Sequence, residues 1–155
     1  MAIVADASGL IHLQRRGQLK AFLAREQVAI TERIKQELVD IPLKKAPFIR
    51  SPELKVLVER SAEEIRDLIE EGRIKVMSIN YRKYSKLLDR VKEDIAAIEG
   101  LQGHQVKADH TLVVLAIQVA EQEGVARVVS MDRTINGVLM AISKERGLRI
   151  EFMKL

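Results

Sequence analysis

The feature that most constrains this chain is an alternation of short, β-branched apolar runs with longer segments of helical periodicity. Runs of this kind indicate parallel strands that are covered by helices on both faces. The predicted strands cover residues 2–5, 28–31, 74–79, 127–131 and 149–152. We therefore expect an α/β fold with three layers, α/β/α, around a central, mainly parallel five-stranded sheet.

The helices between these strands are predicted from apolar spacing, caps and breakers. They cover residues 9–16, 19–25, 32–40, 61–71, 84–98, 108–123 and 135–146. Pro42 is expected to end the third helix. Ser61, with Glu64 three residues on, resembles a capping box that starts the fourth helix. The segment 43–52 contains two prolines and predicts an irregular connection.

Composition narrows the classes of partner and compartment. A length of 155 residues fits one domain. The net charge of +4 favours a polyanionic partner, and the 3% of aromatic residues argues against a base-stacking platform. The absence of cysteine excludes disulfides and thiolate metal sites and fits a reducing cytoplasm. The longest apolar stretch, Leu112 to Ile117, is far shorter than a membrane span, so we expect a cytoplasmic protein.

Four acidic residues stand where a parallel sheet places its ligand crevice. Asp6 follows the first strand, and Asp132 follows the apolar run VARVVSM. Asp109 lies in the first turn of the most apolar helix, and Glu37 lies on the helix that leaves the second strand. Since ligands bind beyond the carboxyl ends of such strands, we expect these carboxylates to meet at one edge of the sheet.

Carboxylates that lie this close repel one another, so the cluster needs a cation to offset its charge. Mg²⁺ and Mn²⁺ prefer oxygen ligands, and Mg²⁺ leaves coordination positions for water and phosphate oxygens. The chemistry that suits such a site is phosphodiester hydrolysis. The pattern therefore predicts a divalent-metal site that acts on a phosphate ester.

Four segments together resemble a known family. IVADASGLIHL is similar to the opening of PIN domains, whose first strand ends in an aspartate followed two residues later by serine or threonine. ITERIKQELVD resembles the second acidic segment, ADHTLVVLAI the helix with the third acid, and VVSMDRTIN the strand end with serine or threonine two residues before aspartate. The match covers about two thirds of the chain, and the middle, from 43 to 106, is less typical.

This resemblance implies a single PIN-like domain over residues 1–155 and an endoribonuclease that depends on Mg²⁺ or Mn²⁺. It implies that the metal ligands and catalytic acids are Asp6, Glu37, Asp109 and Asp132. It also implies that Ser8 belongs to the catalytic set and steadies Asp6 or contacts a metal-bound water, and that Ser130 supports the strand end near Asp132. RNA is the implied substrate. Some small PIN proteins are toxins of the VapC type held by an antitoxin and others process ribosomal RNA, and the resemblance leaves both roles open.

Each of these residues also has a purely structural interpretation. Asp6 with Ser8 fits a turn or helix cap, and Asp109 fits an acid that complements a helix dipole. Glu37 competes with Glu32, five residues earlier, for the second acidic position. If the acids serve structure alone, the alternative is a catalytically inert PIN-like module that binds RNA or protein.

Two other enzyme classes fit less well, because the motifs they need are missing. A phosphoryl-transfer domain of the haloacid dehalogenase type would have a second acid where Ser8 stands. A receiver domain would have an acidic pair before the first helix and a lysine after a late strand, and this order is absent.

Other candidate residues carry less information. His12, His104 and His110 do not have the spacing of a metal-binding pair on one helix, so structural or surface roles are expected. Arg133, next to Asp132, is the basic residue expected to contact substrate, with Ser130 beside it. A homodimer formed through apolar helices is also expected.

Overall fold

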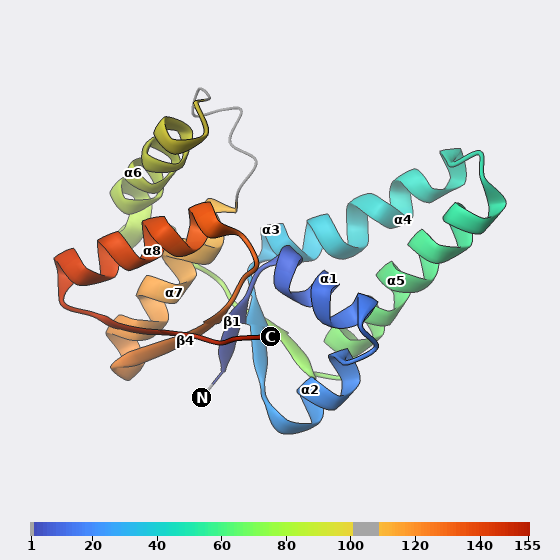
Figure 1. The fold of residues 1–155 in the computed structure, drawn as a ribbon, viewed down its shortest axis with the longest axis horizontal. Coiled ribbons are helices and arrows are strands. Elements are labelled where there is room, and N and C mark those ends of the chain that lie inside the picture. The colour runs from blue at the N-terminus through green and yellow to red at the C-terminus, as the bar shows by residue number, and fades with distance from the viewer. Residues whose placement is uncertain (1, 101–108) are drawn as a thin grey trace.

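The computed structural model describes residues 2–100 and 109–155, and its centre is a five-stranded parallel sheet (Figure 1). The strands are β1 (Ile3–Ala5), β2 (Val28–Ile30), β3 (Ile74–Val76), β4 (Val125–Val129) and β5 (Arg149–Phe152). Their order across the sheet is β3-β2-β1-β4-β5. This confirms the α/β fold with helices around a parallel sheet. Strands β1 and β2 are one residue shorter than predicted and β3 is three residues shorter, whereas β4 starts and ends two residues earlier and β5 matches the prediction.

The strand order places a topological switch between β1 and β4. From β1 the chain moves outward to β2 and β3, and it then crosses to β4 on the other side of β1 and continues to β5. At such a switch the connections leave in opposite directions, and a crevice opens beyond the carboxyl ends of the two strands. The carboxyl ends of β1 and β4 are therefore where a site is expected.

Helices cover the sheet in two groups, and these groups form the outer layers. Helices α6, α7 and α8 pack on one another, α7 also packs on β1, β4 and β5, and α8 on β5, whereas α1 packs on α2 and α5 packs on β3. Among the described residues the helical elements are α1 (Ala7–Arg15), α2 (Leu19–Arg25), α3 (Glu32–Lys35), the π-helical η1 (Gln36–Asp40), α4 (Ile41–Lys45), the 3₁₀ turn η2 (Ala46–Phe48), α5 (Pro52–Glu70), α6 (Tyr81–Glu99), α7 (His110–Glu123) and α8 (Arg133–Arg146).

The central helix α7 explains why one segment is apolar on all sides. Every residue from His110 to Ala120 is buried, because α7 lies between the sheet and the helices α6 and α8. A helix that is buried all round needs no polar face. Its predicted start at residue 108 lies outside the described residues, and the structure begins the helix at His110.

The middle of the chain differs from the prediction, since a helical hairpin replaces the irregular connection. Pro42 does not end a helix: it lies at the start of α4, just after η1, where Ile41 N–H bonds to Gln36. Ser61 is not a cap either. Helix α5 starts nine residues earlier, where the Ser51 hydroxyl accepts from Leu54 N–H and Pro52 occupies the first turn. Proline suits that position because its missing N–H is not needed there.

No described helix is both long enough and apolar enough to cross a membrane.

A close approach between α1 and β4 gives a test of the fold. A Cβ added at Gly9 would lie 2.7 Å from Cγ1 and 2.8 Å from the carbonyl oxygen of Val129. Gly9→Ala should therefore destabilise the protein by about 1–3 kcal/mol, as overpacking usually does. Gly137→Ala on α8 is the matched control, because its added Cβ would have no described neighbour within 4 Å beyond the adjoining residues and the backbone of its own helix. Urea unfolding of the control should show equal or higher stability, and equal losses in both variants would contradict this packing.

Candidate active site

Asp6 lies at the carboxyl end of β1 and joins this strand to β4. Its carboxylate is 2% exposed, and Oδ1 accepts from Gly9 N–H at 2.8 Å and from the Ser8 hydroxyl at 2.7 Å. Oδ2 accepts from the Ser130 hydroxyl, just after β4, at 2.5 Å. Asp6 N–H also donates to Val129 O at 3.3 Å. Asp6 is therefore the N-cap of α1 and also a link between the two strands at the switch.

The two serines extend this link. The Ser8 oxygen accepts from Met131 N–H at 3.0 Å, and the Ser130 oxygen accepts from Asp132 N–H at 3.1 Å. Each hydroxyl therefore donates to Asp6 and accepts from the backbone that follows β4. Together they hold the segment after β4 beside the start of α1.

Asp109 is the N-cap of α7 and is 5% exposed. Its Oδ1 accepts from Thr111 N–H at 2.8 Å and from the Thr111 hydroxyl at 2.5 Å. The Thr31 and Thr111 hydroxyl oxygens lie 2.8 Å apart, and Thr31 Oγ1 accepts from Ile34 N–H. Since Thr111 donates to Asp109, Thr31 must donate to Thr111. The two donors that reach Asp109, the N–H and the hydroxyl of Thr111, both bond to Oδ1. Its Oδ2 is buried and has no hydrogen-bond donor among the described residues.

Glu37 projects from η1 and is held by an arginine one helical turn earlier. Arg33 Nε donates to Glu37 Oε1 at 3.2 Å, and Arg33 Nη1 lies 2.9 Å from His110 Nδ1. Because arginine only donates, Nδ1 accepts and the neutral ring carries its proton on Nε2. Burial, with Arg33 and Lys92 adding repulsion, lowers the pKa of His110 to about 4. His110 is therefore neutral at neutral pH and serves as an acceptor for Arg33.

Charge links three of the four predicted acids. Burial raises the pKa of Asp6 above its ordinary value, and repulsion from Asp109 raises it further. The hydrogen bonds that Asp6 accepts lower its pKa and offset part of this rise. Burial also raises the pKa of Glu37, Asp109 adds to this, and Asp6 contributes a smaller repulsion. The structure therefore brings Asp109 close enough to Asp6 and Glu37 for its charge to raise the pKa of both.

Asp132 lies at the same edge in a different role. Its Oδ1 accepts from Thr134 N–H at 2.9 Å and Ile135 N–H at 3.2 Å, which makes it the N-cap of α8. Its connection to Asp6 passes through Ser130. Within residues 2–100 and 109–155, no three acidic or histidine side chains are arranged to hold a metal ion directly. The four acids share an edge, and the structure does not gather them into a closed ligand set.

Capping explains part of this arrangement and leaves part unexplained. Asp6, Asp109 and Asp132 are all N-caps, as the structural interpretation expects, and each uses Oδ1 for the cap. Capping needs no second oxygen. The buried Oδ2 of Asp109 is therefore an acceptor without a donor among the described residues, and the capping role does not explain it.

Four residues of this network were not predicted as site residues. The sequence pattern predicts no site role for Arg33, Thr31 or Thr111. For His110 it predicts a structural or surface role, and the structure buries this side chain in contact with Arg33. Thr31 and Thr111 lie 80 positions apart in sequence, so no local pattern indicates their contact. The spacing of Arg33 and Glu37, at i and i+4 on one helix, is a signal that was available.

Other predicted residues lie around this edge. Arg133 is exposed on the first turn of α8. His12 is half-buried on α1, and its Nε2 has no partner among the described residues. His104 lies outside the described residues. Lys83, on α6, pairs with Glu121 at 3.5 Å.

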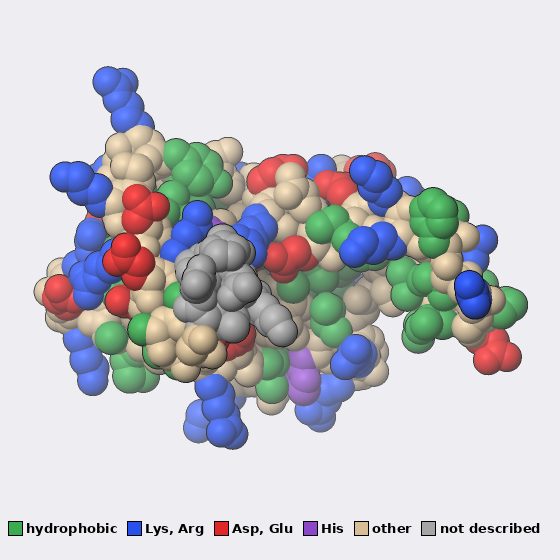
Figure 2. Space-filling model, turned by 90° about the horizontal axis from the view of Figure 1, so that it is seen from above, with side chains coloured by type: hydrophobic (Ala, Val, Ile, Leu, Met, Phe, Trp, Pro, Cys, Tyr) green, Lys and Arg blue, Asp and Glu red, His purple; other side chains and the backbone are tan. Residues whose placement is uncertain are grey.

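A groove of about 550 Å³ lies next to Glu37, between α1 and the hairpin formed by α4 and α5. Its walls are mainly apolar, with Leu38, Leu54 and Leu57 among them, and Arg15 lies at its rim. On the surface, apolar side chains gather at the end of the molecule formed by this hairpin (Figure 2, right).

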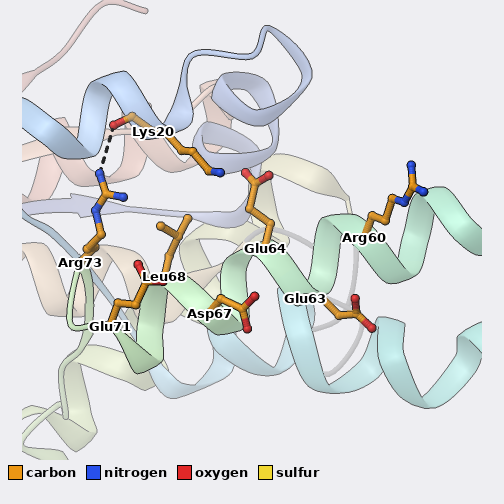
Figure 3. Close-up of a pocket in the computed structure, with 8 residues that line it drawn as sticks. All are labelled: Lys20, Arg60, Glu63, Glu64, Asp67, Leu68, Glu71 and Arg73. Carbon is orange, nitrogen blue, oxygen red and sulfur yellow. Dashed lines mark hydrogen bonds between the residues drawn. The ribbon is translucent and has the colours of Figure 1, made fainter.

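A second pocket, of about 350 Å³, has a different character. Acidic side chains of α5 line it together with Lys20, Arg60 and Arg73, and Arg73 Nη2 donates to Lys20 O at 3.4 Å (Figure 3). Arg73 immediately precedes β3, so this pocket lies by the amino end of a strand, away from the acidic edge. Four acidic and three basic side chains line this pocket.

Comparison with known proteins adds little to this description. No family model and no curated protein matches the chain. Among solved structures, the crystal structure of PAE2754 from Pyrobaculum aerophilum is similar, with 20% identity over 93% of this chain and 96% of that chain and a TM-score of 0.48. The fold class therefore rests on the strand order and register of this chain itself.

The raised pKa of Asp6 predicts how replacing this carboxyl group changes the thermal stability of the protein. A carboxyl whose pKa is raised by folding contributes stability below its ordinary pKa, and this contribution is lost as the pH rises through the raised value. In EDTA at neutral pH, Asp6→Asn should therefore melt ~2–4 °C higher than the wild type. Thermal unfolding should show this advantage shrinking as the pH falls toward 4. Asp40→Asn, an exposed acid, is the control, and a lower neutral-pH melting temperature for Asp6→Asn would contradict the prediction.

Proposed function

We propose that this protein is a divalent-metal-dependent endoribonuclease that hydrolyses RNA phosphodiester bonds at the edge formed by Asp6, Glu37 and Asp109. The observation that carries the proposal is the buried Oδ2 of Asp109, which has no donor among the described residues. It lies in an environment where two further carboxylates have raised pKa values. Such a group of acids is stable when a cation binds it.

The donor set fits a hard ion. Mg²⁺ commonly binds one or two carboxylates and keeps several waters, so a closed cage of protein ligands is not required. Among Asp6, Glu37 and Asp109, the oxygens that no hydrogen bond described above uses are Asp109 Oδ2 and Glu37 Oε2. These two would hold Mg²⁺ or Mn²⁺, with Asp6 and Asp132 acting directly or through water. A bound ion of this kind supplies activation of the attacking water and neutralisation of charge on the phosphate.

The backbone around the acids suits a phosphate substrate. Three helices, α1, α7 and α8, begin at residues that follow Asp6, Asp109 and Asp132, so their positive N-terminal ends meet the same edge. Arg133 is exposed beside them and would contact a phosphate of the RNA strand. The net charge of +4 favours a polyanion.

The resemblance to PIN domains supports the same proposal. The aspartate with a serine two residues on, the helical glutamate, the third aspartate and the serine and aspartate after β4 occur in the family's order. In the structure Ser8 and Ser130 both donate to Asp6. Their role in this proposal is to orient the Asp6 carboxylate.

A cleavage assay tests the proposal. With Mn²⁺ the wild type should cleave single-stranded RNA, and Asp109→Asn should lower the rate by ~10²-fold or more, since loss of even an indirect metal contact costs up to this amount. The asparagine keeps the oxygen that caps α7, so the helix should persist. Asp89→Asn, the same charge change at an exposed position on α6, should cleave like the wild type.

An inert binding module is the alternative, and the same samples distinguish it. It would bind RNA with a salt-dependent affinity and would release no metal-dependent product from any variant. Equal cleavage by the wild type and Asp109→Asn, with or without Mn²⁺, would reject the nuclease.

We further propose a second copy of the chain as the partner of the α4 and α5 hairpin. Phe48 is 84% and Leu57 62% exposed there, and Ile41 and Leu54 add to the apolar surface. An apolar patch of this kind on an otherwise charged protein marks an interaction surface. Light scattering should give a dimer for the wild type and a monomer for Phe48→Ser with Leu57→Ser. A wild-type monomer that instead copurifies with a small protein would favour an antitoxin.

A further inference from the structure

Arg33 contacts the acidic edge, which is the cluster of Asp6, Glu37 and Asp109, and the proposed nuclease mechanism gives it no role. Its side chain is 36% exposed and lies between two groups of the edge. It donates through Nε to Glu37 Oε1 at 3.2 Å and through Nη1 to His110 Nδ1 at 2.9 Å. His110 directly follows Asp109, so Arg33 connects η1 to the start of α7.

The negative charges at this edge make the contact between Arg33 and Glu37 important. Asp6, Glu37 and Asp109 repel one another, and among the ion pairs of the described residues Arg33 provides the one that reaches these acids. A half-exposed pair between residues i and i+4 contributes little to stability by itself. The position of Arg33 therefore matters more for the charge of the edge than for the helix.

The second contact holds Arg33 in place. His110 is 7% exposed, and its Nδ1 accepts from Arg33 Nη1, whereas Glu37 is contacted by a different nitrogen, Nε. The Arg33 guanidinium thus contacts a neutral imidazole, that of His110, and a charged carboxylate, that of Glu37. A turn of Glu37 toward another cation would therefore leave the contact between Arg33 and His110 intact.

We propose that Arg33 is a built-in counter-ion of the acidic edge, which pairs with Glu37 when no divalent ion is bound and competes with such an ion for the Glu37 carboxylate. This inference rests on the proposed function, since it assumes that the edge takes a divalent ion. Its consequence is that Arg33 lets three acids coexist in the metal-free protein and keeps metal affinity lower than the acids alone would give.

Calorimetric titration with Mn²⁺ of the EDTA-treated and dialysed full chain tests the proposal. Arg33→Gln should bind Mn²⁺ about three- to tenfold more tightly than the wild type, because both the competing pair and the repulsion from the guanidinium are removed. Arg33→Lys keeps the charge and should bind within about twofold of the wild type. Arg33→Met is a second neutral variant and should follow Arg33→Gln.

The matched control is Lys35→Gln. Lys35 lies two residues on, has a side-chain exposure of 32%, and pairs with Glu32 at 3.9 Å instead of with an acid of the edge. Its loss changes the net charge equally and should leave Mn²⁺ affinity within about twofold of the wild type. In a Glu37→Gln background the gain from Arg33→Gln should shrink, because the competition is then gone.

Each outcome has a separate meaning. If the wild type binds Mn²⁺ and both neutral variants bind equally or more weakly, Arg33 positions Glu37 and the counter-ion proposal is wrong, while the metal site stands. If Lys35→Gln gains as much as Arg33→Gln, the effect is one of net charge and the proposal is also wrong. If neither the wild type nor any Arg33 variant binds Mn²⁺, the proposed metal-dependent function fails and the counter-ion proposal fails with it.

Discussion

The link between β1 and β4 through the Asp6 carboxylate is the interaction on which the edge depends. One side chain caps α1 with Oδ1 and receives the Ser130 hydroxyl on Oδ2. Because β1 and β4 meet where the strand order reverses, this contact connects the start of α1 to the segment that leads into α8. A buried carboxylate in this role is expensive, and its raised pKa expresses that penalty.

The edge combines structural and chemical demands in the same residues. Asp6, Asp109 and Asp132 each cap the start of a helix, so hydrogen bonds from the backbone hold one oxygen of each carboxylate in place. A rigid support of this kind suits catalysis, since functional groups need to be held in place before substrate arrives. The two interpretations are therefore compatible: capping uses one oxygen of each acid, and the proposed metal chemistry uses others.

The metal-free protein must tolerate these acids, and its means of doing so are visible in the network. Hydroxyl and backbone donors surround Asp6, and Thr31 and Thr111 direct their hydroxyls to one oxygen of Asp109. Arg33 faces Glu37. Each acid thus has a partial compensation of its own, and the oxygen of Asp109 that lacks a donor among the described residues is where the proposed ion belongs.

The sequence alone determined the parallel α/β architecture and the edge to which Asp6, Asp109 and Asp132 belong, because strand periodicity and caps are local properties. It did not reveal the hairpin of α4 and α5, because Pro42 and Ser61 were interpreted as a helix end and a helix start. Pro42 instead lies at the start of α4 and Ser61 lies inside α5, and whether such residues end or start a helix depends on the packing around them. Only the tertiary structure decided that Thr31 meets Thr111 and that Arg33 joins Glu37 to His110. Contacts between distant segments follow from packing, which no short window of sequence contains.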